Sequence, residues 1–305
     1  MENILLTGAS GMVGKSILKI FKKENFIIFS PKRYNLNLSN IDKVKKYILK
    51  RKITSVIHAA GLVGGIQDNI DYPHSYLLKN SLINLSLIEA ARITKIKKLI
   101  FIGSSCMYPK NINRPIEEED LLKSPLENTN EGYAISKIFG YKLCEYSNKQ
   151  HKTKFKTIVS TNLFGENDKF DGNKAHLVSA ILQKVFDAKR KKEKKIEIWG
   201  DGKARRDFIH VDELSKFILF SINNYKKIPE LINFGSGKDF TINQYYKKIF
   251  KILKVNVKFK NNLKKPSGMK RKLLSIKKLK KIRYNLNYNF EKRIKDTFKN
   301  EFIRN

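Results

Sequence analysis

The chain is poor in several kinds of residue, and each shortage excludes a class of protein. Only two cysteines occur among 305 residues, too few for a disulfide framework and in keeping with a reducing compartment. No apolar run approaches the roughly 18 residues that a membrane helix needs. The first residues lead directly into a strand-like run, which leaves no room for a signal peptide. We therefore expect a cytoplasmic protein with no membrane partner.

Acidic residues are also scarce. Asp and Glu number 28 against 63 Lys and Arg, which gives a formal net charge of +35. The excess is concentrated in residues 184–195 and in residues 240–290, where no acidic residue occurs. Such a charge can indicate a nucleic-acid binder, but here the basic residues are not interleaved with aromatic ones and match no known binding module. We expect no nucleic-acid partner, although the surface would attract anionic ligands.

Short apolar runs alternate with amphipathic stretches along the first half of the chain. Five of these runs are predicted to be buried strands of a parallel sheet: residues 3–7, 26–29, 55–58, 99–103 and 156–159. The intervening segments are long enough for crossover helices. The pattern predicts an α/β fold, a doubly wound parallel (Rossmann) sheet with a smaller C-terminal substrate-binding lobe.

After Thr161 the alternation of apolar runs and amphipathic stretches becomes less regular. We predict a polar loop over residues 164–174 and a helix over residues 176–188. Short strands are predicted at residues 196–199, 208–211 and 231–234.

A glycine-rich motif follows the first run directly. Gly8, Gly11 and Gly14 form G-x-x-G-x-x-G between a predicted strand and a predicted helix, which is the context in which such glycines bring the backbone close to a pyrophosphate. The predicted cofactor contacts in this motif are Gly8, Ser10, Gly11, Met12, Val13 and Gly14. An acid after the second strand would favour NAD. Lys32 and Arg33 stand there instead and can pair with a 2′-phosphate, which predicts NADPH/NADP.

These observations give a domain assignment. Residues 1–165 are predicted to form an NADP-binding Rossmann domain, to which residues 207–235 approximately return. Residues 166–305 are predicted to form mainly the substrate lobe.

A Tyr-x-x-x-Lys pattern indicates reductase chemistry. Tyr133 and Lys137 would lie on one face of a helix, where the ammonium can stabilise the phenolate and let the tyrosine act as an acid. Ser104 comes about 30 residues earlier, at the end of the fourth predicted strand, where it can hydrogen-bond a carbonyl beside the nicotinamide. The order and spacing of these three residues make a strong combined signal.

Several longer segments carry a resemblance to a known family. They are residues 58–66 (HAAGLVGGI), 103–109 (GSSCMYP), 125–134 (PLENTNEGYA), 161–165 (TNLFG), 199–202 (WGDG) and 206–212 (RDFIHVD). With the motifs above they resemble the extended short-chain dehydrogenase/reductases over nearly the whole chain. Within that family they are most similar to the branch that makes GDP-L-fucose.

The resemblance implies an activity. It implies NADPH-dependent 3,5-epimerisation and 4-reduction of a GDP-4-keto-6-deoxy sugar, giving GDP-L-fucose or a close relative. It also implies a homodimer formed through helices around residues 75–95 and 133–149, and no metal.

The resemblance also implies roles for particular residues. The implied catalytic residues are Ser104, Tyr133 and Lys137 for reduction and Cys106 and His176 as the acid/base pair for epimerisation. Further implied cofactor contacts are Ala59, Ala60, Lys137, Asn162, Leu163 and His176. Implied contacts to the GDP part of the substrate are Lys184, Trp199 and Arg206.

Two alternatives remain open, the first because of one departure from the family pattern. Where the family has Asp after two leucines, this chain has Ser275, after Leu273 and Leu274. That acid contacts the substrate in the family. The first alternative is a GDP-4-keto-sugar 4-reductase, for a hexose or a heptose, without epimerase activity. The second is a non-catalytic, basic NADP-binding protein.

Overall fold

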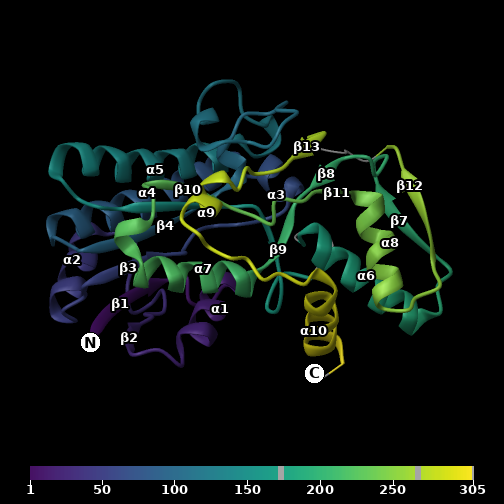
Figure 1. Ribbon diagram of the computed structural model, residues 1–305, viewed down its shortest axis with the longest axis horizontal. Coiled ribbons are helices and arrows are strands. Elements are labelled where there is room, and N and C mark those ends of the chain that lie inside the picture. Colours follow the sequence, from purple (N-terminus) through teal and green to yellow (C-terminus); the bar gives the residue numbers. More distant parts are fainter. Residues whose placement is uncertain (171–174, 265–268, 304–305) are drawn as a thin grey trace.

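The protein is described by a computed structural model that covers residues 1–170, 175–264 and 269–303. At its centre lies a six-stranded parallel sheet with the strand order β10-β5-β4-β3-β1-β2 (Figure 1). The strands are β1 (Glu2–Thr7), β2 (Phe26–Phe29), β3 (Ser55–His58), β4 (Lys98–Ser104), β5 (Lys156–Ser160) and β10 (Leu231–Phe234). The five predicted strands and the run at 231–234 all lie in this sheet, so the predicted doubly wound α/β fold is confirmed.

Helices cover both faces of the sheet (Figure 1). One face is covered by α1 (Met12–Phe21) and α7 (Val211–Asn223), and the other by α2 (Ile41–Lys50), α4 (Pro73–Ile93) and α5 (Glu131–His151). Successive strand residues point to opposite faces. Ile4 therefore packs with Phe217 of α7, while its neighbour Leu5 packs with Val44 of α2. Burial on both faces explains why these strands are continuously apolar.

The strand order reverses between β1 and β3, because the chain runs from β1 to β2 on one side and then returns to β3 on the other. In open α/β sheets the crevice at such a reversal, beyond the carboxyl ends of the strands, is where ligands bind. The glycine-rich motif follows β1, and Ala59 follows β3. Both predicted cofactor segments therefore meet at this point.

The C-terminal part encloses a core of its own, with Ile181, Tyr245 and Phe298 among its buried members. The elements around it are α6 (Leu177–Lys191), β7 (Lys195–Trp199), α8 (Ile242–Ile252), β12 (Lys258–Asn262) and α10 (Phe290–Phe302). Figure 1 shows them beside the carboxyl side of the main sheet. Here β12 pairs in parallel with β7.

The remaining elements are short. The short strands are β6 (Asn162–Phe164), β8 (Arg205–Arg206), β9 (Phe208–His210), β11 (Phe240–Thr241) and β13 (Arg271–Lys272). The short helices are α3 (Ile66–Asp71) and α9 (Lys277–Lys281), with 3-10 turns at Ser105–Met107, Glu118–Asp120, Asn128–Asn130 and Tyr225–Lys227. β6 pairs with β9, and β8 lies between β11 and β13.

The later predictions have mixed outcomes. The predicted helix at 176–188 is α6, and the strand at 196–199 is β7. The strand predicted at 208–211 ends at His210 and pairs with β6 rather than entering the main sheet. The predicted loop is wrong at Phe164, which ends β6. It is confirmed for residues 165–170, and its residues 171–174 lie outside the described residues. Within the described ranges, no helix has both the length and the apolarity to cross a membrane.

Candidate active site

The glycine-rich turn forms a cradle that side chains would fill. Gly8 has φ +73°, and a Cβ on it would lie 2.6 Å from the backbone of Ala59. A Cβ on Gly14 would lie 2.2 Å from the carbonyl oxygen of Gly8. Gly11 caps the start of α1, whose first N–H groups have no partner within the helix. A pyrophosphate fits this turn, because the backbone can approach it and the helix N-terminus favours its charge.

The other predicted cofactor residues of the first half lie along the same edge. Met12 and Val13 begin α1, and Ser10 is exposed in the turn before it. Lys32 and Arg33 are exposed just beyond β2, the strand that pairs with β1. Both cations thus lie at the carboxyl end of the strand next to β1, which the glycine-rich turn follows.

The predicted reductase residues come from one strand and one helix. Ser104 ends β4, and Tyr133 and Lys137 lie in the first turns of α5. The Lys137 Nζ lies 5.8 Å from the centre of the Tyr133 ring and donates a 2.9 Å hydrogen bond to the carbonyl of Ile102. The structure therefore brings these three predicted residues together at the carboxyl end of β4.

Burial sets the protonation of this group. It raises the pKa of the Tyr133 phenol above its ordinary value, and a hydrogen bond from Ser104 opposes the rise. Burial also lowers the pKa of Lys137 to about 8, so that the ammonium is still the main form at neutral pH. Tyr133 is thus held in its protonated form beside a cation.

A buried polar chain behind this group was missed by sequence reasoning. His58 Nδ1 lies 2.9 Å from the Thr7 hydroxyl, and its Nε2 lies 3.0 Å from Asn84 Oδ1. Asn84 in turn donates to the carbonyl of Ser136, which precedes Lys137. Burial, followed by the nearby Lys137 charge, lowers the pKa of His58 to about 3, so this imidazole is neutral. A single histidine in an apolar run gives no signal of these partners.

Cys106 lies next to the reductase group in the 3-10 turn that follows β4. Its sulfur accepts a 3.2 Å hydrogen bond from Asn130 Nδ2 and lies 3.8 Å from Lys272 Nζ. A negative charge on Cys106 would act to raise the pKa of both Tyr133 and Arg206. The structure thus joins three predicted residues, Cys106, Tyr133 and Arg206, in one neighbourhood. Asn130 and Lys272 were missed as members of it, although Asn130 stands within a family-like segment.

His176 stands at the start of α6 and does not cap that helix with its side chain. Its Nδ1 lies 3.1 Å from Asp168 Oδ1, and Ser179 donates to the same carboxylate. Burial opposes charge on the imidazole, but the hydrogen bond and charge of Asp168 outweigh it and raise the pKa of His176. Among the described residues, no hydrogen bond joins His176 to Cys106 or Tyr133. Asp168 was missed, since an acid in a polar loop looks like any solvated residue.

The remaining predicted contacts lie on the C-terminal side. Lys184 of α6 donates a 2.6 Å hydrogen bond to the carbonyl of Glu197 on β7. Trp199 lies two residues further along β7, and its side chain is exposed. Asn162 donates to the carbonyl of Asp207, and Leu163 packs against the main core. Lys184 and Trp199 therefore lie on adjoining elements. The structure places Asn162 and Leu163 where the main sheet meets the second part.

Ser275, which stands where the family pattern has an acid, is buried, and its hydroxyl accepts a 3.5 Å hydrogen bond from the Lys277 N–H. Its backbone N–H donates a 2.7 Å bond to the carbonyl of Ile116. This position therefore supplies no carboxylate.

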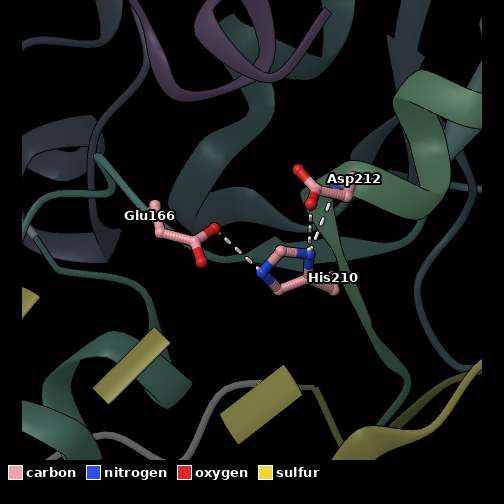
Figure 2. A group of neighbouring side chains, drawn as sticks. All are labelled: Glu166, His210 and Asp212. Carbon is pink, nitrogen blue, oxygen red and sulfur yellow. Dashed lines mark hydrogen bonds and ion pairs between the residues drawn. The ribbon is translucent and has the colours of Figure 1, made fainter. Parts of the chain in front are cut away.

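Glu166, His210 and Asp212 form the cluster that most resembles a metal site, with ligand atoms within 4.8 Å of one another. Figure 2 shows the imidazole between the two carboxylates. His210 Nε2 pairs with Glu166 at 3.2 Å, and His210 Nδ1 accepts the Asp212 N–H. Lys19, Arg293 and Ser16 donate to the Asp212 carboxylate. Burial would raise the pKa of Glu166, but His210 lowers it to about 2.

These contacts give the cluster a structural role, because its carboxylates and imidazole already have hydrogen-bond partners within the protein. It ties α1 and α7 to α10. The loop that holds Asp168 is fixed from the same side, since the Asn167 N–H donates to Glu301 of α10 at 2.7 Å. We therefore assign no metal to the cluster.

A family model described as the NAD dependent epimerase/dehydratase family matches residues 4–235. The chain belongs to this family. It is accordingly an oxidoreductase that uses a nicotinamide cofactor, which agrees with the cradle at Gly8–Gly14 and the Ser104, Tyr133 and Lys137 group. The family resemblance predicted from the motifs is confirmed.

Curated relatives of the family extend over most of the chain. A GDP-L-colitose synthase of Yersinia pseudotuberculosis is 44% identical over 89% of this chain and 88% of its own length. A GDP-L-fucose synthase of Escherichia coli (strain K12) is 32% identical over 92% of this chain and 90% of its own length.

Solved structures agree in fold. A GDP-6-OMe-4-keto-L-xylo-heptose reductase from C. jejuni superposes with a TM-score of 0.89 at 26% identity, covering 98% of this chain and 97% of its own. A GDP-L-fucose synthetase from Naegleria fowleri, bound to NADP, superposes with a TM-score of 0.86 at 26% identity, covering 98% and 92%.

Proposed function

We propose that this enzyme reduces C4 of a GDP-4-keto-6-deoxy sugar with NADPH and also epimerises C3 and C5. The observation that carries the proposal is that the residues for reduction and a residue for epimerisation lie close together. Ser104, Tyr133 and Lys137 form the reducing group, and Cys106 lies beside Tyr133. The names of the relatives, which are GDP-sugar synthases and reductases, support the substrate class.

The proposed cofactor is NADPH rather than NADH. The backbone at Gly8–Gly14 would hold the pyrophosphate, and Lys32 and Arg33 would pair with the 2′-phosphate. The relative bound to NADP supports this choice. When bound, the cofactor supplies the hydride for C4.

Reduction needs a proton for the C4 oxygen, and Tyr133 is placed to donate it. Ser104 hydrogen-bonds the same oxygen and orients the carbonyl. The Lys137 ammonium stabilises the phenolate that Tyr133 leaves behind, so that the proton can move near neutral pH. Solvent then returns a proton to Tyr133.

Epimerisation uses the acidity that the 4-keto group gives to the protons on C3 and C5. Cys106, as a thiolate, removes such a proton and leaves an enolate. His176, whose charged form is favoured because Asp168 raises its pKa, returns a proton from the opposite face. The thiol and the neutral imidazole then exchange their protons with solvent, which restores both groups for the second centre.

The GDP part of the substrate would contact Lys184, Trp199 and Arg206, since a Lys and an Arg suit a diphosphate. We also propose a homodimer through α4 and α5, which pack on each other. These helices expose large apolar side chains at Leu78, Leu82, Leu85, Ile135 and Tyr146. Such a surface is typical of a protein interface.

The test is direct. The enzyme is given NADPH and GDP-4-keto-6-deoxy-mannose in heavy water, and the product is analysed by NMR. Oxidation of NADPH with deuterium at C3 and C5 supports the full proposal. If NADPH is not oxidised by any GDP-4-keto sugar, the proposal is wrong and the non-catalytic alternative stands.

A second candidate is a GDP-4-keto-sugar reductase that does not epimerise. Two observations favour it: Ser275 stands in place of the family acid, and solved structures of heptose C4 reductases superpose closely. Oxidation of NADPH without deuterium at C3 or C5 would establish this candidate.

A further inference from the structure

Lys272 is a buried cation that pairs with no acidic side chain among the described residues. The side chain lies on β13, and the residue is only 7% exposed. Its Nζ lies 3.8 Å from the Cys106 sulfur, which is its one hydrogen-bond partner among the described side chains. The preceding residue, Arg271, differs in this respect, because it pairs with Asp239 at 2.6 Å.

A buried ammonium is costly unless a negative charge or several acceptors compensate for it. The sulfur of Cys106 can supply that charge only as a thiolate, since a thiol is a weak, neutral acceptor. The Asn130 amide donates to the same sulfur at 3.2 Å. The Arg206 guanidinium and the Tyr133 phenol are also near enough for a charge on the sulfur to act on both of them. The sulfur therefore has donors and cations around it, and no carboxylate is bonded to it within the described ranges.

The backbone around Lys272 fixes the direction of its side chain. β13 pairs with β8 so that Lys272 stands opposite Arg206. Immediately after it, the carbonyl of Leu273 accepts from the Ile116 N–H at 2.8 Å, and the Ser275 N–H donates to the Ile116 carbonyl. Leu273 and Leu274 are buried. The ammonium is thus anchored from both sides of the strand and does not depend on a mobile loop.

We propose that Lys272 is a positioning residue that holds the Cys106 sulfur as a thiolate before any substrate is bound. The proton of the thiol passes to solvent, and the ammonium stays charged as the counter-ion. The use of this thiolate as the base for C3 and C5 rests on the proposed function. The ion pair itself does not, so it can be tested on the enzyme without substrate.

The first experiment measures alkylation of Cys106 by iodoacetamide at neutral pH, followed by peptide mass spectrometry. Cys144 is buried and serves as an internal measure of folding, because it reacts only when the core opens. We expect Lys272→Met to slow alkylation of Cys106 by about tenfold, since the thiolate is the nucleophile. Lys272→Arg should keep most of the rate. The matched control is Lys270→Met, which removes an exposed ammonium two residues away and should change nothing.

The second measurement needs no Lys272 variant. A thiolate absorbs in the ultraviolet where a thiol does not, so the wild-type enzyme should absorb more there at neutral pH than Cys106→Ser. Equal absorbance would overturn the proposal even if Lys272→Met does not fold. A folded Lys272→Met with unchanged alkylation would also overturn it. If such a variant then raised only KM for the GDP sugar, Lys272 would be a substrate contact instead.

Discussion

The reducing group and the epimerising pair are built in different ways. Ser104, Tyr133 and Lys137 come from the seven-residue strand β4 and the 21-residue helix α5, which pack directly on each other. Cys106 and His176 depend on side chains from elsewhere: Lys272, which follows Cys106 by 166 residues, and Asp168, whose loop is held by α10. The first group is fixed by regular secondary structure and the second by tertiary contacts. Substitutions should therefore separate the two activities.

The largest effect is expected at Tyr133. Tyr133→Phe removes the proton donor for the C4 oxygen, and loss of a general acid costs on the order of 10²-fold or more in kcat. NADPH binding should be nearly unchanged, because the cradle at Gly8–Gly14 is untouched. Deuterium exchange at C3 and C5 should continue. NADPH oxidation, cofactor titration and NMR measure the three quantities, and near-wild-type turnover would disprove the assignment of Tyr133.

The converse change is at Cys106. Cys106→Ser should lower deuterium exchange at C3 and C5 by about 10²-fold, because a hydroxyl is a far weaker base than a thiolate. Reduction of the unepimerised keto sugar should persist, and the product should retain its original C3 and C5 configuration. The control is Cys144→Ala, which alters a cysteine of α5 that is buried with Leu5 on one face of the main sheet. A Cys106→Ser variant with wild-type exchange would remove Cys106 from the mechanism.

The choice between NADPH and NADH depends on residues next to the main sheet, as the reducing group does. Arg33→Ala should weaken NADPH but not NADH, because a charge-assisted contact to the 2′-phosphate contributes roughly 1.5–3 kcal/mol. The preference should fall by about 10- to 100-fold. Binding of each cofactor can be followed by fluorescence titration, with Arg190→Ala on α6 as a control of equal charge. Equal losses of affinity for both cofactors would mean that Arg33 contributes only general positive charge at the surface.

The same contrast explains how much the sequence could predict. The main sheet was predictable because each strand is a continuous apolar run, and Tyr133 and Lys137 because helical spacing alone places them on one face. The short strands β8 and β13 have two residues each and owe their existence to partners far along the chain. Lys272 and Asp168 were missed for the same reason. Nothing near Lys272 distinguishes it from the other lysines of a very basic segment until β13 is placed beside β8.

The smallest expected effect concerns Asp168. Asp168→Asn removes the carboxylate that raises the pKa of His176, so the imidazole should lose its proton at a lower pH than in the wild type. Exchange at C3 and C5 should then decline earlier as the pH rises. The loss at neutral pH should be about tenfold or less, below the roughly 10²-fold cost of removing an acid outright.

The free energy of unfolding should also depend on the protonation of His176. Because the pKa of His176 is raised in the folded state, its pairing with Asp168 stabilises the fold at low pH, and this contribution disappears as the pH rises through the folded-state pKa. Asp168→Asn should therefore lower Tm in mildly acidic buffer more than in alkaline buffer. The matched control is Asp187→Asn, a partly exposed acid on α6 whose partner Arg190 lies at 4.0 Å. If both variants showed the same pH profiles of exchange and of Tm, Asp168 would have no more effect on His176 than an acid at the surface. The contact between Asp168 and His176 would then not be needed for epimerisation, and this difference from the reducing group would disappear.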